Sequence, residues 1–166
     1  MCSSCFGMIL KMRINMNKRA LKVYIETSVI SGYGRQRFHH DLMRFFDMIR
    51  AGDFIPIISA HTLTELNRDK TPIEVTNNLT TIQYIVYQTT DEMNKLAEKY
   101  MERKIIVESY KDDALHIAIA TVLKVDILVS WNLTHIVNEI TIPLFNKVNI
   151  ENGYQIIDIK KPEEIM

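Results

Sequence analysis

Short apolar runs rich in β-branched residues alternate along this chain with longer segments of helical periodicity. The runs at 21–25, 54–58 and 127–130 are typical of strands that are buried on both faces. Two weaker runs, 82–88 and 154–159, predict further strands. Between them, residues 39–51 place Leu42, Phe45, Phe46 and Ile49 on one face of a helix that ends before Gly52.

Further helices are predicted from caps and periodicity. Ser59 and Thr90 are typical N-caps for helices that continue to about 69 and 103, and a third helix begins near Lys111, where Ser109 and Asp112 approximate a capping box. Residues 73–79 and 133–145 are also expected to be helical.

Strands that alternate with helices predict an α/β fold in three layers (α/β/α) with a mostly parallel central sheet. The chain has 166 residues, and we expect one domain over 19–166. Residues 1–18 are expected to be a tail that is disordered or lies before the true start, since their few apolar residues are interrupted by Lys11 and Arg13.

Charge and composition narrow the choice of partners. The chain carries 20 basic and 20 acidic side chains, so binding to nucleic acid would need a local basic patch or a metal ion. No apolar run approaches the roughly 20 residues of a membrane span, so we expect a soluble, cytoplasmic protein without a membrane partner. Cys2 and Cys5 supply half of a four-ligand zinc site, with no second cysteine pair downstream.

Polar side chains gather where the predicted sheet would bind a ligand. Glu26 follows the first strand and Asn132 the strand at 127–130, while Glu65 and Asp113 lie on helices that border the same edge. Carboxylate and amide oxygens without an accompanying set of histidines or cysteines favour Mg²⁺ or Mn²⁺.

Three blocks of the sequence resemble the PIN-domain family, the metal-dependent nuclease fold that includes the VapC-type toxins. They are VYIETSVI at 23–30, SAHTLTEL at 59–66 and DALHIAIATVLKVDILVSW at 113–131, and the resemblance extends from about residue 21 to 159. It implies a Mg²⁺- or Mn²⁺-dependent endoribonuclease, the toxin of a toxin–antitoxin pair, whose RNA-cleaving crevice an antitoxin protein occupies. For such a toxin we also expect a homodimer.

The resemblance also implies that Glu26, Glu65 and Asp113 ligate the metal. Asn132 stands where the family frequently has a fourth acid, and it brings a carbonyl oxygen but no charge. Glu26 stands where the family usually has the shorter Asp. These two departures leave open an alternative function, a PIN-like domain that binds RNA or a protein without cleaving.

Several residues have two readings. Helical periodicity alone does not choose between Asp112 and Asp113 as the ligand. Glu65 could instead pair with Arg68 on its own helix, and hydrogen bonding is favoured over metal ligation for His116 and His135. Four side chains near the predicted site could orient the carboxylates: Thr27, Ser28, Asp112 and Ser130. Three basic residues are candidate contacts for RNA: Arg35, Arg37 and Lys111. A phosphotransfer receiver also gathers acids at strand ends, but no Lys follows a late strand where that chemistry needs one.

Overall fold

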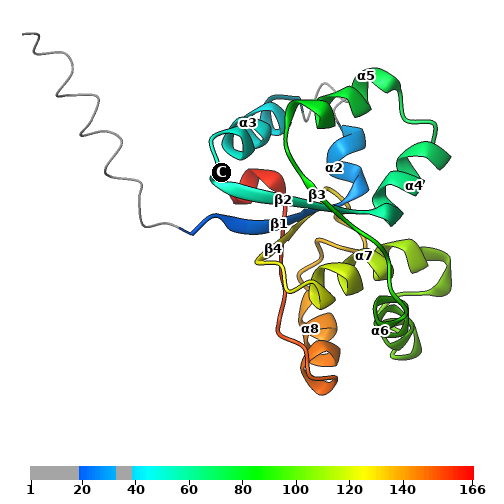
Figure 1. Ribbon diagram of the computed structural model, residues 1–166. Coiled ribbons are helices and arrows are strands. Elements are labelled where there is room, and N and C mark those ends of the chain that lie inside the picture. The colour runs from blue at the N-terminus through cyan, green and yellow to red at the C-terminus, as the bar shows by residue number, and fades with distance from the viewer. Residues whose placement is uncertain (1–18, 33–38) are drawn as a thin grey trace, which may run out of the picture.

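A parallel five-stranded sheet forms the centre of the structure, a computed structural model that describes residues 19–32 and 39–166 (Figure 1). The strand order is β3-β2-β1-β4-β5, and each neighbouring pair is parallel. The central strand is the first in sequence, so its carboxyl end lies between those of β2 and β4. The strands are β1 Leu21–Ile25, β2 Phe54–Ser59, β3 Ile85–Tyr87, β4 Ile127–Val129 and β5 Asp158–Lys160.

Helices cover both faces of the sheet, which confirms the predicted three-layer α/β/α class. Figure 1 shows α2, α3 and α5 on one side and α6, α7 and α8 on the other. Within the described residues, no helix is long and apolar enough to cross a membrane. The helices are α2 Thr27–Ser31, α3 His39–Arg50, α4 Ala60–Arg68, α5 Ile73–Thr76, α6 Asp91–Glu102, α7 Lys111–Val122 and α8 Ile142–Glu151.

One apolar core lies on each face of the sheet, because successive side chains along a strand point to opposite faces. In β1, Val23 and Ile25 pack with the buried face of α3, whereas Tyr24 packs with α6, α7 and α8 on the opposite side. All three residues are fully buried. This explains why β1 is an apolar run without a polar face.

The predicted caps and strands are largely confirmed. Ser59 Oγ accepts a hydrogen bond from the Thr62 amide at 3.1 Å, and Thr90 Oγ1 accepts one from Met93 at 3.4 Å. These bonds satisfy amide groups that the first turns of α4 and α6 leave unpaired. The strand at 21–25 has the predicted bounds, and those at 54–58 and 127–130 differ from them by one residue.

The predicted helix at 133–145 is wrong. The chain forms a turn in which the amides of Ile136 and Val137 donate to the Asn132 carbonyl, and α8 begins only at Ile142. Pro143 lies in the first turn of α8, where its missing N–H costs nothing; inside a longer helix it would break the ladder of hydrogen bonds. Asn138 also favours a break, because its Oδ1 accepts from the Ile140 amide at 2.9 Å.

Smaller predictions also need correction. Ser109 does not cap α7: it lies in the 3-10 helix Glu108–Tyr110, and the N-cap is Tyr110 without a side-chain hydrogen bond. The segment at 82–88 contains only the three-residue strand β3, and the strand predicted at 154–159 begins only at Asp158, where β5 starts, and ends one residue later than predicted. The helix at 73–79 is α5 followed by the 3-10 helix Asn77–Thr81.

The loop after β4 packs closely on the end of α2. A Cβ atom on Gly32 would lie 2.5 Å from Cζ3 of Trp131, so a larger residue would displace the ring. Trp131 Nε1 donates to Glu163 at 2.9 Å, and the ring packs against the core on the α3 side. These contacts support packing, rather than stacking on a nucleic-acid base, as the role of Trp131. The ring holds the segments after β1 and β4 together.

We expect Tyr100→Phe to destabilise the fold by about 1–2 kcal/mol, because the fully buried hydroxyl donates to Asn149 Oδ1 at 2.5 Å and its loss leaves a buried acceptor underpaired. Tyr154→Phe is the matched control, since its hydroxyl bonds to the exposed Glu92. Chemical denaturation measures both. Equal losses in the two variants would contradict this account.

Candidate functional site

Glu26 is a buried carboxylate at the carboxyl end of the central strand. It is 4% exposed and forms the N-cap position of α2. Its Oε2 accepts hydrogen bonds from Ser28 Oγ and, at 2.8 Å, from Ser130 Oγ, which follows β4. A buried carboxylate needs such donors. Ser28 and Ser130 supply these donors to Glu26, and their supporting role at a metal site stays a prediction.

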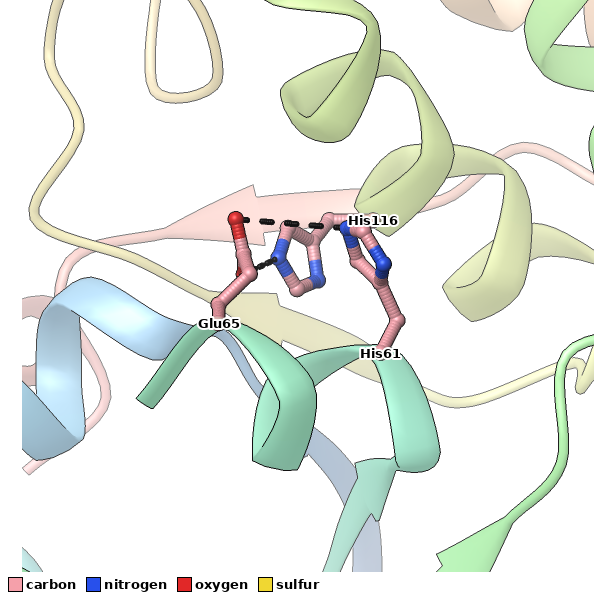
Figure 2. A group of neighbouring side chains, drawn as sticks. All are labelled: His61, Glu65 and His116. Atoms are coloured by element: carbon pink, nitrogen blue, oxygen red, sulfur yellow. Dashed lines mark hydrogen bonds and ion pairs between the residues drawn. The ribbon is translucent and has the colours of Figure 1, made fainter. Parts of the chain in front are cut away.

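Glu65 lies on α4 and is 7% exposed. Its Oε2 accepts from Thr27 Oγ1 and lies 2.6 Å from Nε2 of His116, a fully buried residue of α7 (Figure 2). The Nδ1 atom of His116 lies 2.7 Å from the hydroxyl of Tyr24 in β1. One side chain on α7 thus links the sheet to the carboxylate on α4.

The Glu65 and His116 groups are charged as a pair. Burial tends to raise the pKa of Glu65, but the hydrogen bond and charge of His116 and the hydrogen bond from Thr27 lower it to about 2. Burial likewise tends to lower the pKa of His116, yet the contacts with Tyr24 and Glu65 outweigh it and raise that pKa well above its ordinary value. These opposite shifts favour an ion pair between Glu65 and His116 across the 2.6 Å contact.

His61 adds a second imidazole to this pair. It lies four residues before Glu65 on α4, so both side chains share one helix face, and its Nε2 is 3.9 Å from Glu65 Oε1. Burial lowers the pKa of His61, and the charge of His116 lowers it further. Ligand atoms of His61, Glu65 and His116 all lie within 4.8 Å of one another, and in the described part of the chain they form the one set of three acidic or histidine side chains that does so.

Asp113 and Asn132 meet through His135. Asp113 Oδ2 lies 2.8 Å from His135 Nδ1, and Asn132 Oδ1 accepts from the His135 amide at 3.1 Å. The backbone N–H of Asn132 in turn donates to Ser130 Oγ at 2.9 Å. In this structure His135 therefore links Asp113 to the turn that follows β4.

The four predicted site residues fall into two hydrogen-bonded groups. One runs from Glu26 through Ser130, Asn132 and His135 to Asp113. The other joins Glu65 to Thr27 and His116, which lie next to Glu26 and one turn after Asp113 in the chain. Four segments distant in sequence supply these groups. Glu26 and Asp113 nevertheless stand outside the tight group around Glu65, so their part in holding an ion stays a prediction.

Asp112 and Asp113 point to different neighbours. Asp112 pairs with Arg68 Nη1 at 2.9 Å and lies 3.4 Å from His61 Nε2, whereas Asp113 contacts the loop after β4. Arg68 Nη2 also lies 3.4 Å from Glu65 Oε1, so the pairing expected within α4 exists beside the His116 contact. Which aspartate binds an ion stays open.

The structure does not test the three residues predicted to contact RNA. Arg35 and Arg37 lie outside the described residues, and Lys111 is an exposed residue at the start of α7. Sequence reasoning missed Arg68 as a cation at the site, and it missed His61. His61 could have been found from its position four residues before Glu65 on a predicted helix, which places both side chains on one face. The third residue of the group, His116, lies on another helix, so the sequence does not show that the three meet.

The free energy of unfolding at acidic pH should depend on the buried pair of Glu65 and His116. The lowered pKa of Glu65 means that its contribution to stability is complete above about pH 4.5 and is lost as the pH falls toward about 2. The raised pKa of His116 means that its contribution is complete below about pH 6.5 and is lost only as the pH rises through the raised pKa. For protein kept in a chelator, we expect Glu65→Gln to cost up to about 3 kcal/mol near pH 5–6 and much less near pH 3. Glu102→Gln, an exposed change on α6, is the control. Denaturation curves whose difference is independent of pH would contradict the charged pair.

No family model matches the sequence, and no curated protein matches it. Solved structures that share its fold include two from toxin–antitoxin systems. One is VapC20 of Mycobacterium tuberculosis, a toxin that cleaves the sarcin–ricin loop, with 19% identity and a TM-score of 0.50 over 64% of this chain and 86% of that one. The other is VapBC2 of Rickettsia felis bound to a DNA fragment from its promoter, with 12% identity and a TM-score of 0.53 over 85% of this chain and 98% of that one.

These likenesses agree with the three-layer α/β/α architecture of the chain. At these identities they establish the fold. The chain therefore has the fold of the VapC toxins, the PIN-domain fold that its three sequence blocks predict.

Proposed function

We propose that this protein is a divalent-metal-dependent endoribonuclease and the toxin of a toxin–antitoxin pair, with Glu26, Glu65 and Asp113 as metal ligands. The observation that carries the proposal is that one hydrogen-bonded group contains Glu26, Asn132 and Asp113 at the carboxyl edge of the sheet, while Glu65 is bonded to Thr27, the chain neighbour of Glu26. Ligands bind at this edge in open parallel α/β sheets. The VapC20 likeness adds a precedent for RNA cleavage on this fold.

The donor set fits a hard divalent cation. Glu26 and Glu65 are 4% and 7% exposed, and both offer carboxylate oxygens held by neighbouring hydroxyl groups. A bound Mg²⁺ or Mn²⁺ would supply an activated water and neutralise charge on the scissile phosphate. Without such a cation, the carboxylates would repel the RNA backbone.

The chain's own residues then have distinct parts. Ser28 and Ser130 hold Glu26, Thr27 holds Glu65, and His135 holds Asp113, so each carboxylate is fixed before substrate arrives. Positioned ligands lower the reorganisation that the reaction would otherwise require. Arg68 is half-exposed beside Glu65 and Asp112, where its guanidinium can meet a phosphate.

An antitoxin protein is the proposed partner, and the VapBC2 likeness supports it. A partner that covers the site would keep the toxin inactive in the cytoplasm until it is released. We further propose that the protein forms a homodimer, as expected from its resemblance to the toxins.

A second candidate function is a domain that binds RNA without cleaving it. The observation in its favour is Asn132, whose Oδ1 accepts from the His135 amide and so serves as a cap of the turn after β4. An amide in this position completes local structure and adds no charge. With Asn132 uncharged, only three carboxylates, those of Glu26, Glu65 and Asp113, would be left to hold the ion that cleavage needs.

Cleavage of RNA by purified protein in Mg²⁺ or Mn²⁺ tests the proposed function. We expect Asp113→Asn and Glu26→Gln each to lower the rate by about 100-fold or more, because an ion at the reacting phosphate contributes several kcal/mol. Asp47→Asn, a change at an exposed residue of α3, is the matched control and should keep full activity.

The same preparation separates the two functions. A chelator should abolish cleavage, and RNA binding should remain measurable in the variants by fluorescence anisotropy. Cleavage that survives both substitutions and the chelator would refute the active site. Binding with no cleavage in either metal would favour the second candidate.

A further inference from the structure

We propose that His61, Glu65 and His116 form a binding site for a first-row transition-metal ion of the Co²⁺ and Zn²⁺ type. The inference goes beyond the proposed function: this site shares Glu65 with the proposed nuclease centre but takes a different class of ion. Figure 2 shows the three side chains converging from α4 and α7.

The distances suit a single ion. The three ligand atoms lie within 4.8 Å of one another, with 3.9 Å from His61 Nε2 to Glu65 Oε1. Ligands around a tetrahedral Zn²⁺ with bonds of about 2.1 Å are separated by about 3.4 Å. The 2.6 Å contact between His116 Nε2 and Glu65 would lengthen on binding, because the ion takes the place of the shared proton.

His116 is oriented in the manner of a metal-bound imidazole. Its Nδ1 lies 2.7 Å from the Tyr24 hydroxyl, which lies 2.8 Å from Ser59 Oγ, and all three side chains are buried. Ligating histidines usually donate their second N–H to a fixed acceptor, which leaves the other nitrogen for the ion. Here that other nitrogen is Nε2, and it faces Glu65.

His61 supplies the independent sign of a ligand. Its Nε2 is buried and has no hydrogen-bond partner, although Asp112 Oδ1 lies 3.4 Å away. A buried polar atom left unpaired costs about 1–3 kcal/mol, and such atoms in native proteins call for an explanation. An ion between His61 and Glu65 would pair this nitrogen.

The ligand types select the ion. Two imidazole nitrogens and one carboxylate suit Zn²⁺, Co²⁺ or Ni²⁺, whereas Mg²⁺ prefers oxygen ligands and retains its waters. Arg68, whose Nη2 is 3.4 Å from Glu65 Oε1, must move aside for the ion. Its side chain is 55% exposed, so it can turn toward solvent.

The opposing explanation is that Glu65 and His116 form a structural pair with no ion. Both explanations place the same charges in the same core, so stability alone cannot separate them. The role of His61 separates them, because a structural pair does not need it.

Titration of the full-length protein with Co²⁺ in millimolar Mg²⁺ tests the proposal by visible absorption, with no RNA present. Cys2 and Cys5 are first replaced by Ser, since a CxxC pair can itself bind Co²⁺. We expect one equivalent of Co²⁺ to bind, Zn²⁺ to displace it, and His61→Gln to weaken binding by at least about tenfold. His40→Gln, at an exposed histidine of α3, should bind like the parent.

A second measurement needs no histidine variant. The chain has five histidines, and Co²⁺ should shift or broaden the ring signals of His61 and His116 in the nuclear magnetic resonance spectrum before those of the other three. Failure of one equivalent to bind, unchanged binding by a folded His61→Gln, or selective effects on other histidines would overturn the proposal. Because no RNA is involved, cleavage in Mg²⁺ without Co²⁺ binding would refute this site alone, and Co²⁺ binding without cleavage would refute the nuclease alone.

Discussion

The contact between Glu65 and His116 is the interaction on which the candidate site depends. A buried carboxylate and a buried imidazolium each lose hydration, and the loss is offset only because they hydrogen-bond to each other at 2.6 Å and to Thr27 and Tyr24. The pair connects α4, α7 and β1. Removal of either partner would leave an uncompensated charge between the sheet and its helices.

The parallel sheet explains why the other polar groups lie nearby. In a sheet of this kind every strand ends at the same edge, so Glu26 after β1 and Ser130 after β4 meet although 104 residues separate them. The buried residues of β1 and β4, 23–25 and 127–129, carry no charge. Glu26 therefore lies just past the end of β1, where hydroxyl groups replace the water that its carboxylate loses.

The site has two chemically different halves that share Glu65. Glu26, Asp113 and Asn132 offer oxygen atoms on the side of β4, whereas His61 and His116 offer nitrogen atoms on the side of α4. The first half suits a hard cation that meets phosphate, and the second suits a transition-metal ion. The choice of ion and the proposed RNA cleavage therefore depend on the same carboxylate.

The sequence by itself determined the α/β class, the three main strands, α3 and the caps at Ser59 and Thr90, because apolar periodicity and capping act over a few residues. It also placed Glu26 and Glu65 near one edge. It failed at 133–145, where Pro143 and the Asn138 side chain prevent a continuous helix. Only the tertiary structure decided that His116 faces Glu65 and His61, since contacts between α4 and α7 arise from packing across about 50 residues of chain and leave no local pattern.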